Sequence, residues 1–504
     1  MTSQRLFLEP RISLLPPVAP LIPVALLGVV LLVALLPPMT SGLLLAAAGL
    51  ALAVLIRPWL GLPLTALIAP FAALRPLPLG GLPVDGADLA LALTLAAWLA
   101  QGVAQRRIVL PRAPLTWPML ALLAALGLSL LAAPSYREGL PELLKWLQVL
   151  ALYLAAAVLL TRRRAGWLIA ALLAAGVGQA LLGLHQFLTQ TGPEAFILPG
   201  GFMRAYGAFR QPNPYAGYLG LAAPLAISLA LWSWRGSLGK ARRAHGLRLA
   251  LTAAAGLISL GLLVSWSRGA WLAFGAALAV VLLAQARRAA PAMLALAVLA
   301  ALTLGLLGAA DLLPPAIAGR LGALQDYVGL VDVARTEVTD ANFSVVERIA
   351  HWQAALDMWR DHLWLGVGAG NYAVVYEQYN LPRWYQSLGH AHNVYLNFAA
   401  EAGLLGLLAY GWFWLAALWQ GLRCAAQRNR LASAVGAGVL GGLVAASVHN
   451  FFDNLWVQHI YLTLALLLGL LTSFCPAEPS AAQHTCTVGA DAPSESMHVP
   501  ITQP

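Results

Sequence analysis

Charged residues and cysteines are scarce in this sequence. Only 10% of its 504 residues are Asp, Glu, Lys or Arg, whereas 60% are hydrophobic, and soluble globular proteins usually contain about 25% charged residues. The composition therefore excludes a soluble globular protein and predicts a polytopic membrane protein. Three cysteines, Cys424, Cys475 and Cys486, imply no disulfide framework, because all fall on the side that we expect to be cytoplasmic.

Long apolar segments make up most of the chain. A membrane-spanning helix needs roughly 20 mostly apolar residues, and about fourteen segments come near that length, so we expect an all-α fold with about 12–14 transmembrane helices. The first segment is long, contains prolines and lacks a small-residue cleavage site, so we expect a retained helix. The expected spans are 18–37, 41–56, 59–74, 87–104, 115–133, 143–160, 165–188, 214–233, 249–266, 270–285, 291–310, 394–420, 432–451 and 456–474.

The basic residues are concentrated in alternate loops. Because positively charged loops stay in the cytoplasm, these loops and both chain termini are expected inside. The net charge of +10 therefore marks topology and does not indicate nucleic-acid binding. The loops that carry most of the Lys and Arg residues are 105–112, 161–164, 235–248, 286–288 and 423–430. Arg5, Arg11 and Arg57 fall on the same expected side of the membrane.

This topology divides the chain into two parts. Residues 1–474 form one polytopic membrane domain, with a large extracytoplasmic loop at 311–393. Residues 475–504 are rich in Ala, Ser, Pro and Thr and contain no Lys or Arg, so we expect a disordered cytoplasmic tail.

The extracytoplasmic loop contains a helix and a turn. Ser344-Val345-Val346-Glu347 fits a capping box that opens a helix running to about Asp361. Apolar side chains recur on this helix at helical spacing and are expected to form its buried face; they are Ile349, Trp352, Leu356 and Trp359, flanked by Arg348 and His351. The sequence GVGAGNY (366–372) predicts a turn. It does not indicate a nucleotide-binding loop, because no βαβ unit surrounds it.

Two arginine-containing motifs lie on the expected outer side. The first, YGAFRQPNP (206–214), contains Tyr206, Arg210 and Asn213. Its prolines favour an extended turn, and the helix that follows presents an N-terminus suited to an anion. The second, SWSRGAW (265–271), places Arg268 near the hydrocarbon boundary, where a charged side chain is costly and usually functional.

The third motif is GHAHN (389–393), which contains His390, His392 and Asn393 just before a helix. Imidazole is the natural proton-transfer group near neutral pH. The alternative is a metal site, since His-x-His can supply two ligands. The possible further ligands are Glu401, Asp453, His449 and His459; none has a spacing typical of metal sites, so we expect no metal.

Together these residues suit phosphate chemistry outside the cytoplasmic membrane. No ATP is available there, so a substrate must be activated inside, as a polyprenyl-pyrophosphate glycan is. Arg210 and Arg268 lie at the depth of its pyrophosphate, and guanidinium groups bind phosphate oxygens bidentately. A neutral imidazole can then accept the proton of an incoming hydroxyl group. Neither a metal nor a cofactor is required.

The order of these motifs resembles the O-antigen ligase and Wzy-type polymerase superfamily of bacterial envelope enzymes. The resemblance spans roughly residues 200–420 and rests on FRQPNPYAGYL, SWSRGAW, ERIAHWQAALDMWRDHLWLGVGAGNY and HAHNVYLNFAAEAGLLG. It implies a GT-C-like, many-helix protein of the bacterial inner membrane. In that family, such proteins transfer glycan from a lipid-linked donor to a glycan or lipid acceptor without metal.

Carried over by motif, the resemblance assigns roles to individual residues. Arg210 and Arg268 match the arginines assigned to the donor pyrophosphate, and His392 matches the proposed catalytic base. We expect the remaining site residues to bind substrate: Arg348, His390, Asn393, Tyr206 and Asn213.

Two questions stay open at this stage. The ligase and polymerase branches share these motifs. A transporter or flippase for an anionic solute or a lipid-linked sugar is the alternative from another class. A translocation path should carry ionisable groups near helix midpoints, and the expected helices contain few.

Overall fold

The computed structural model describes residues 36–74, 77–79, 82–106, 111, 113–198, 201–237, 241–285, 333, 335–339 and 342–475. The expected helix at 291–310, nearly all of the one at 18–37, and the tail beyond residue 475 lie outside these residues. The chain divides into two units, Met1–Arg57 and Pro58–Pro504. The first contains one described helix, α2 (Pro38–Ile56).

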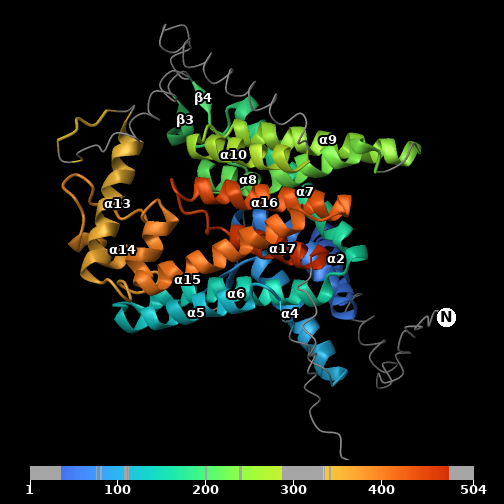
Figure 1. Ribbon diagram of the computed structural model, residues 1–504, viewed down its shortest axis with the longest axis horizontal. Coiled ribbons are helices and arrows are strands. Elements are labelled where there is room, and N and C mark those ends of the chain that lie inside the picture. Colours follow the sequence, from blue (N-terminus) through green and yellow to red (C-terminus); the bar gives the residue numbers. More distant parts are fainter. Residues whose placement is uncertain are drawn as a thin grey trace, which may run out of the picture. The chain divides into compact units, whose positions relative to one another are not determined.

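The second unit is built almost entirely of helices (Figure 1). Its only described strands form two short antiparallel hairpins, β1 (Leu77–Leu79) with β2 (Leu82–Val84), and β3 (Ile197–Leu198) with β4 (Phe202–Met203). The helices are α3 (Gly61–Ile68), α4 (Gly86–Ala104), α5 (Thr116–Ser129), α6 (Tyr136–Leu159), α7 (Arg162–Thr189), α8 (Pro212–Trp232), α9 (Arg242–Leu263), α10 (Arg268–Gln285), α13 (Phe343–Asp361), α14 (Tyr372–Val375), α15 (Val394–Ala425), α16 (Arg430–His449) and α17 (Ile460–Phe474).

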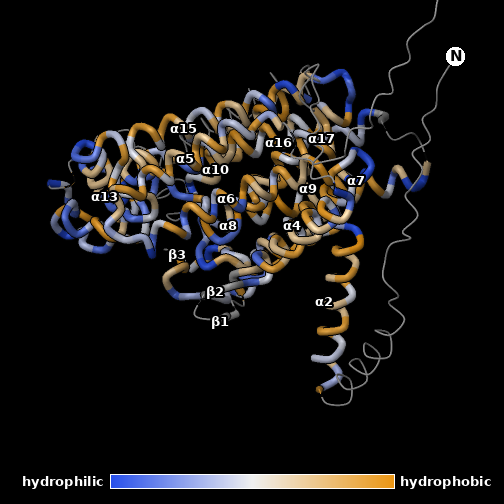
Figure 2. Tube along the Cα trace, turned by 90° about the horizontal axis from the view of Figure 1, so that it is seen from below, coloured by the Kyte–Doolittle hydropathy of each residue, from blue (hydrophilic) through white to orange (hydrophobic). Residues whose placement is uncertain are grey.

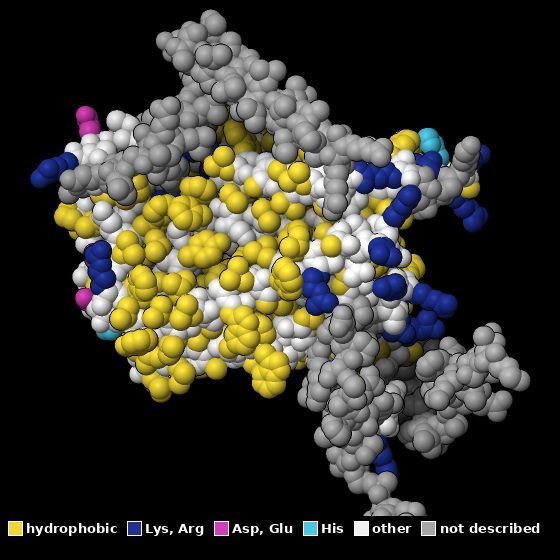
Figure 3. Space-filling model, viewed as in Figure 1, with side chains coloured by type: hydrophobic (Ala, Val, Ile, Leu, Met, Phe, Trp, Pro, Cys, Tyr) yellow, Lys and Arg dark blue, Asp and Glu magenta, His cyan; other side chains and the backbone are white. Residues whose placement is uncertain are grey.

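The all-α polytopic fold is confirmed. Among the described residues, 9 helices are long and apolar enough to cross a membrane, and three shorter apolar segments accompany them, at 58–72, 116–132 and 460–474. The expected span at 59–74 is a short α-helix between two 3₁₀ segments. Hydrophilic residues lie mainly at the ends of the helices and apolar ones between them (Figure 2). A broad hydrophobic surface covers the middle part of the helices (Figure 3), as contact with lipid requires.

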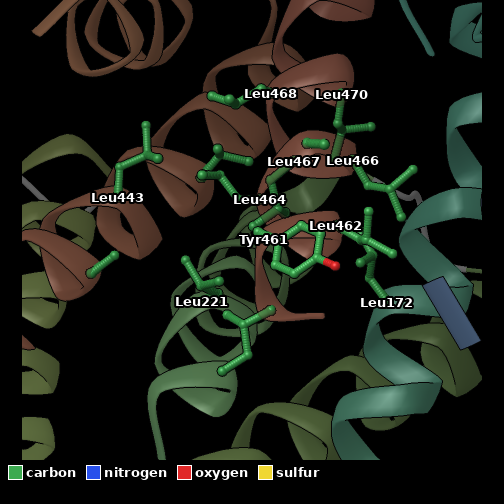
Figure 4. Packing of buried hydrophobic residues seen from close by; sticks show 14 of the residues in the cluster. Leu172, Leu221, Leu443, Tyr461, Leu462, Leu464, Leu466, Leu467, Leu468 and Leu470 are labelled. Carbon is green, nitrogen blue, oxygen red and sulfur yellow. The ribbon is translucent and has the colours of Figure 1, made fainter. Parts of the chain in front are cut away.

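Helix α17 forms the centre of the second unit. It has 15 residues, and nearly all of them are buried. Leu172 of α7, Leu221 of α8 and Leu443 of α16 surround it (Figure 4). A helix that is apolar on all sides belongs inside a protein. Its burial fixes the position of the loop that precedes it, residues 450–459, which we call the α16–α17 loop.

Glycines allow α16 to approach the backbone of α8 closely. A Cβ atom at Gly438 would lie 2.6 Å from the Cα atom of Leu225, and one at Gly442 would lie 2.9 Å from the carbonyl oxygen of Leu221. Small residues at such contacts are typical of helix pairs in membranes. The close packing brings the C-terminus of α16 beside the N-terminus of α8.

Helix α15 is broken at Gly403, where φ is +63°. The segment after α13 pairs with the broken backbone: the amide of Val367 donates to the carbonyl of Ala400 (2.8 Å), and that of Gly368 donates to Glu401 (2.9 Å). The glycine-rich sequence is therefore a turn, as predicted. These bonds hold the segment after α13 against α15.

Two details predicted for the loop helix are wrong. Helix α13 begins at Phe343 and has no side-chain cap; the hydroxyl of Ser344 instead accepts a hydrogen bond from Arg268. The buried face also differs, because small residues pack closely against α15, Tyr372 of α14 and Tyr376. That face comprises Val345, Val346, Ala350, His351, Ala354, Ala355 and Met358, whereas Ile349, Trp352, Leu356 and Trp359 are half-buried.

Candidate active site

The α16–α17 loop brings together segments that are far apart in the sequence. Nδ1 of His392 lies 3.3 Å from Oδ1 of Asp453, and Nδ2 of Asn213 donates to Oδ2 of the same aspartate at 2.8 Å. Nε of Arg348 donates to the carbonyl of Phe452 (2.9 Å). Two of the sequence motifs and the loop helix therefore meet around Asp453.

Local backbone contacts fix the position of His392. Asn393 caps α15, since its Oδ1 accepts from the amides of Tyr395 (3.0 Å) and Leu396 (3.1 Å). The carbonyl of His392 accepts from the indole of Trp352 at 3.3 Å. His392 itself adopts a left-handed conformation with φ of +51°, which is uncommon for residues other than glycine. The structure thus gives Asn393 a capping role.

The two nitrogens of the His392 ring have different surroundings. Nδ1 faces Asp453, whereas the buried Nε2 has no hydrogen-bond partner among the described residues. A carboxylate accepts hydrogen bonds, so it favours the tautomer with the proton on Nδ1. The lone pair on Nε2 is then available to accept a proton, as a general base requires.

His390 is arranged differently. Its Nδ1 accepts a hydrogen bond from the backbone amide of His392 (3.1 Å), so the neutral ring carries its proton on Nε2, which lies 4.0 Å from Oδ1 of Asp453. Burial, and next the charge of His392, lower the pKa of His390 to about 3, although Asp453 opposes this. His390 is therefore neutral, and its Nδ1 is engaged by the backbone, so His392 is the better candidate for a base.

Asp453 is buried and ionised. Burial alone would raise its pKa, but the hydrogen bond with His392 and the charges of His392, His390 and Arg348 hold the pKa of this carboxyl well below its usual range. The amide of Asn454 also donates to Oδ1 at 2.8 Å. A fixed negative charge thus stands behind the His392 ring.

Arg268 and Arg348 converge on Ser344, one of the first residues of α13. Nη2 of Arg268 donates to its Oγ (2.8 Å), and Nη1 of Arg348 donates to its carbonyl oxygen (2.7 Å). Arg210 is exposed, and only its backbone amide is tied to the α16–α17 loop, through Oε1 of Gln458 (3.1 Å). Its guanidinium makes no hydrogen bond with the residues that the structure describes.

Tyr206 does not join this cluster in the described part of the chain. Its ring contacts Phe196, with 5.3 Å between the centroids, and its amide donates to Gln186 of α7 at 3.1 Å. Asn213, from the same motif, reaches Asp453 instead. The structure therefore separates two residues that the sequence placed in one group.

Two residues of α13 that the sequence did not assign to the site face His392. Nδ1 of His351 lies 3.0 Å from the hydroxyl of Tyr372, and its ring centroid lies 5.6 Å from that of His392. Burial, then the charges of His392 and Arg348, lower the pKa of His351 to about 4. Burial raises the pKa of Glu347, against the charges of His392 and Arg348. Their i, i+4 spacing on one helix was a usable signal.

Two groups of residues carry ligands suited to a metal. His390, His392 and Asp453 place one ligand atom each within 4.8 Å of one another, as do Asp85, Asp88 and His459. Two imidazoles and a carboxylate form a donor set that zinc accepts. His459 was a possible further ligand beside His390 and His392, and this is wrong. His459 contacts Asp85 at 3.4 Å and Asp88 at 3.6 Å and does not belong to the Asp453 group.

The fold and the site define an all-α polytopic membrane protein in which a half-buried histidine pairs with a buried aspartate, with arginines at the same end of its helices. Residues 253–411 match the family model described as O-Antigen ligase. This segment is therefore similar to the O-antigen ligase family. The match covers Arg268, Arg348 and His392 and supports a membrane glycan ligase or polymerase type of function. No curated protein matches the chain.

Proposed function

We propose that the protein is a membrane glycosyltransferase that transfers glycan from a polyprenyl-pyrophosphate donor to a hydroxyl group of a glycan or lipid acceptor. The observation that carries this proposal is the orientation of His392, whose Nδ1 faces Asp453 and whose Nε2 is unpartnered among the described residues. A base oriented in this way suits the activation of a hydroxyl nucleophile.

The donor pyrophosphate would be held by arginines. Arg268 is the first residue of α10, so backbone amides of the helix N-terminus add to its charge. Arg210 is exposed and lies just before the N-terminus of α8 in the sequence. Guanidinium groups remain charged and bind phosphate oxygens in pairs. Arg348, through Ser344, supports the position of Arg268.

The reaction would proceed as one displacement at the anomeric carbon. The acceptor oxygen forms a bond to that carbon while its proton passes to Nε2 of His392. The bond between the anomeric carbon and the pyrophosphate oxygen breaks, and polyprenyl pyrophosphate leaves with its charge neutralised by the arginines. Asp453 stabilises the imidazolium that forms.

Our proposal requires no metal, because the arginines supply the positive charge that a cation would bring. The competing interpretation makes His390, His392 and Asp453 metal ligands. Activity that survives EDTA supports the proposal. Activity that EDTA abolishes and Zn²⁺, Mn²⁺ or Mg²⁺ restores supports the metal instead.

We place the site on the outer side of the bacterial cytoplasmic membrane, with both termini in the cytoplasm. Support comes from the opposite ends of the helices, where arginines gather: Arg162 donates to the carbonyl of Phe474 (3.1 Å), and Arg430 donates to that of Arg235 (3.3 Å). A single cysteine introduced at position 335 should react with an impermeant maleimide added outside. Reaction from inside only would overturn this topology.

The decisive experiment compares His392→Gln with His390→Gln and with His362→Gln, an exposed histidine beyond α13. Purified protein in nanodiscs is supplied with the lipid-linked glycan of the source cell. We expect kcat to fall at least about 100-fold in His392→Gln, with donor binding nearly unchanged, and less in His390→Gln. Wild-type turnover in His392→Gln would end the general-base proposal.

Deleting the protein and examining the cell-envelope glycans would distinguish a ligase from a polymerase. Envelope glycans that carry single repeats but no long chains indicate a polymerase. Accumulation of lipid-linked polymer indicates a ligase.

A further inference from the structure

The side-chain amide of Asn213 is held at both ends. Its Oδ1 accepts a hydrogen bond from Nη2 of Arg204 (3.0 Å), and its Nδ2 donates to Oδ2 of Asp453 (2.8 Å). A guanidinium can only donate and a carboxylate can only accept. The partners therefore determine which way this amide points.

Arg204 is itself anchored to the neighbouring motif. Its Nε donates to the carbonyl of Ser265 (3.0 Å), and the next residue, Ala205, donates its amide to the carbonyl of Val264 (3.0 Å). The loop that carries Ser265 also leads to Arg268. Arg204 thus ties the turn before α8 to the loop before α10.

The two oxygens of Asp453 have separate partners. Oδ2 accepts a hydrogen bond from Asn213, whereas Oδ1 accepts one from the amide of Asn454 and one from Nδ1 of His392. The final torsion of an aspartate is broad and roughly two-fold, so a hydrogen bond to one oxygen fixes where the other points. Without Asn213, only the contacts at Oδ1 hold the carboxylate, so its orientation toward Nδ1 of His392 is less tightly fixed.

We propose that Arg204 and Asn213 are positioning residues that orient the His392 base through Asp453. This inference rests on the proposed function. It also replaces the expectation that Asn213 binds substrate, because both ends of its amide are already engaged by protein.

The first test separates positioning from substrate binding. In Asn213→Ala and in Arg204→Gln we expect kcat to fall about 10-fold, the lower end of the range for residues that orient a metal-binding histidine through a carboxylate, with the donor KM unchanged. The double variant should lose little more than either single variant, because both act on one chain of contacts. Arg137→Gln, an exposed arginine near the start of α6, is the matched control and should keep wild-type kcat.

The second test uses Asn213→Asp, which keeps the shape of the side chain. At neutral pH the new carboxylate repels Asp453. At lower pH one proton is shared between the two carboxyl groups, and the protonated side chain at position 213 donates as the native amide did. The ratio of variant to wild-type kcat should therefore rise as the pH is lowered. A role confined to folding predicts no such rise.

The outcomes distinguish this inference from the proposed function. A raised donor KM with unchanged kcat in Asn213→Ala, or a ratio for Asn213→Asp that is flat with pH, would overturn the positioning role. If His392→Gln is inactive in the same assay, the proposed function survives that result. Thermal unfolding of each variant in the nanodisc, compared with that of the wild type, distinguishes a loss of activity from a loss of folding.

Discussion

Asp453→Asn should be severely damaging although it changes only one atom. If the amide oxygen replaces Oδ1, its NH₂ group faces Nδ2 of Asn213, and two donors meet. Asn213 cannot turn round, because Arg204 donates to its oxygen. If the oxygen replaces Oδ2, the NH₂ group faces the amide of Asn454 and Nδ1 of His392.

Both arrangements have a cost that can be bounded. Each leaves at least one buried donor without an acceptor, and each such donor costs about 1–3 kcal/mol of stability. In the second arrangement His392 must present a lone pair on Nδ1, so its proton moves to Nε2 and the base is lost. In the first arrangement the tautomer is kept, but the negative charge that stabilises the imidazolium is lost. Loss of a general base lowers the rate by about 10²–10⁴-fold.

The assay measures kcat, donor KM and thermal unfolding of the same nanodisc preparation. We expect kcat to fall at least about 100-fold, with the donor KM little changed and the unfolding temperature lowered. The control is Asp357→Asn, a carboxylate of α13 whose side chain is 47% exposed, and it should behave as wild type. Turnover in Asp453→Asn close to that of this control would refute the role of Asp453.

Three further predictions follow from other contacts. Arg268→Lys and Arg210→Lys should each reduce glycan transfer by correctly inserted protein at least about 10-fold, because lysine cannot bind phosphate bidentately; near-normal transfer by both would remove the pyrophosphate assignment. Burial lowers the pKa of His351 from 6.5 to about 4 in the folded protein. The neutral ring therefore contributes its full stability at pH values above about 6.5, the pKa in the unfolded chain. That stability should be lost below about pH 6.5, by up to about 1.4 kcal/mol per pH unit, so His351→Phe should flatten the acid decline of the unfolding temperature; an unchanged slope counts against it. Gly403→Ala should destabilise the protein by about 1–3 kcal/mol or more in chemical unfolding, because its Cβ would lie 2.3 Å from the carbonyl of Trp364, whereas Gly411→Ala meets open space and should not.

The class of fold and most helix positions were predictable from the amino-acid sequence. The expected spans 270–285 and 394–420 correspond to α10 (Arg268–Gln285) and the longer α15 (Val394–Ala425). These positions were predictable because apolar length is a local property that the bilayer selects directly. The motifs around Arg268, Arg348 and His392 were also visible in sequence, as polar residues in an otherwise apolar chain.

Which side chains work together was not predictable from the sequence, because it depends on tertiary packing. Asp453 lies 61 residues from His392 and 240 from Asn213, and no local pattern pairs them. The pairing arises because α16 packs closely on α8 and the buried α17 fixes the loop between α16 and α17. The buried face of α13 was decided in the same way. Periodicity identified one face with large apolar side chains, but the close approach of α15 selected the neighbouring face, where alanines and His351 fit.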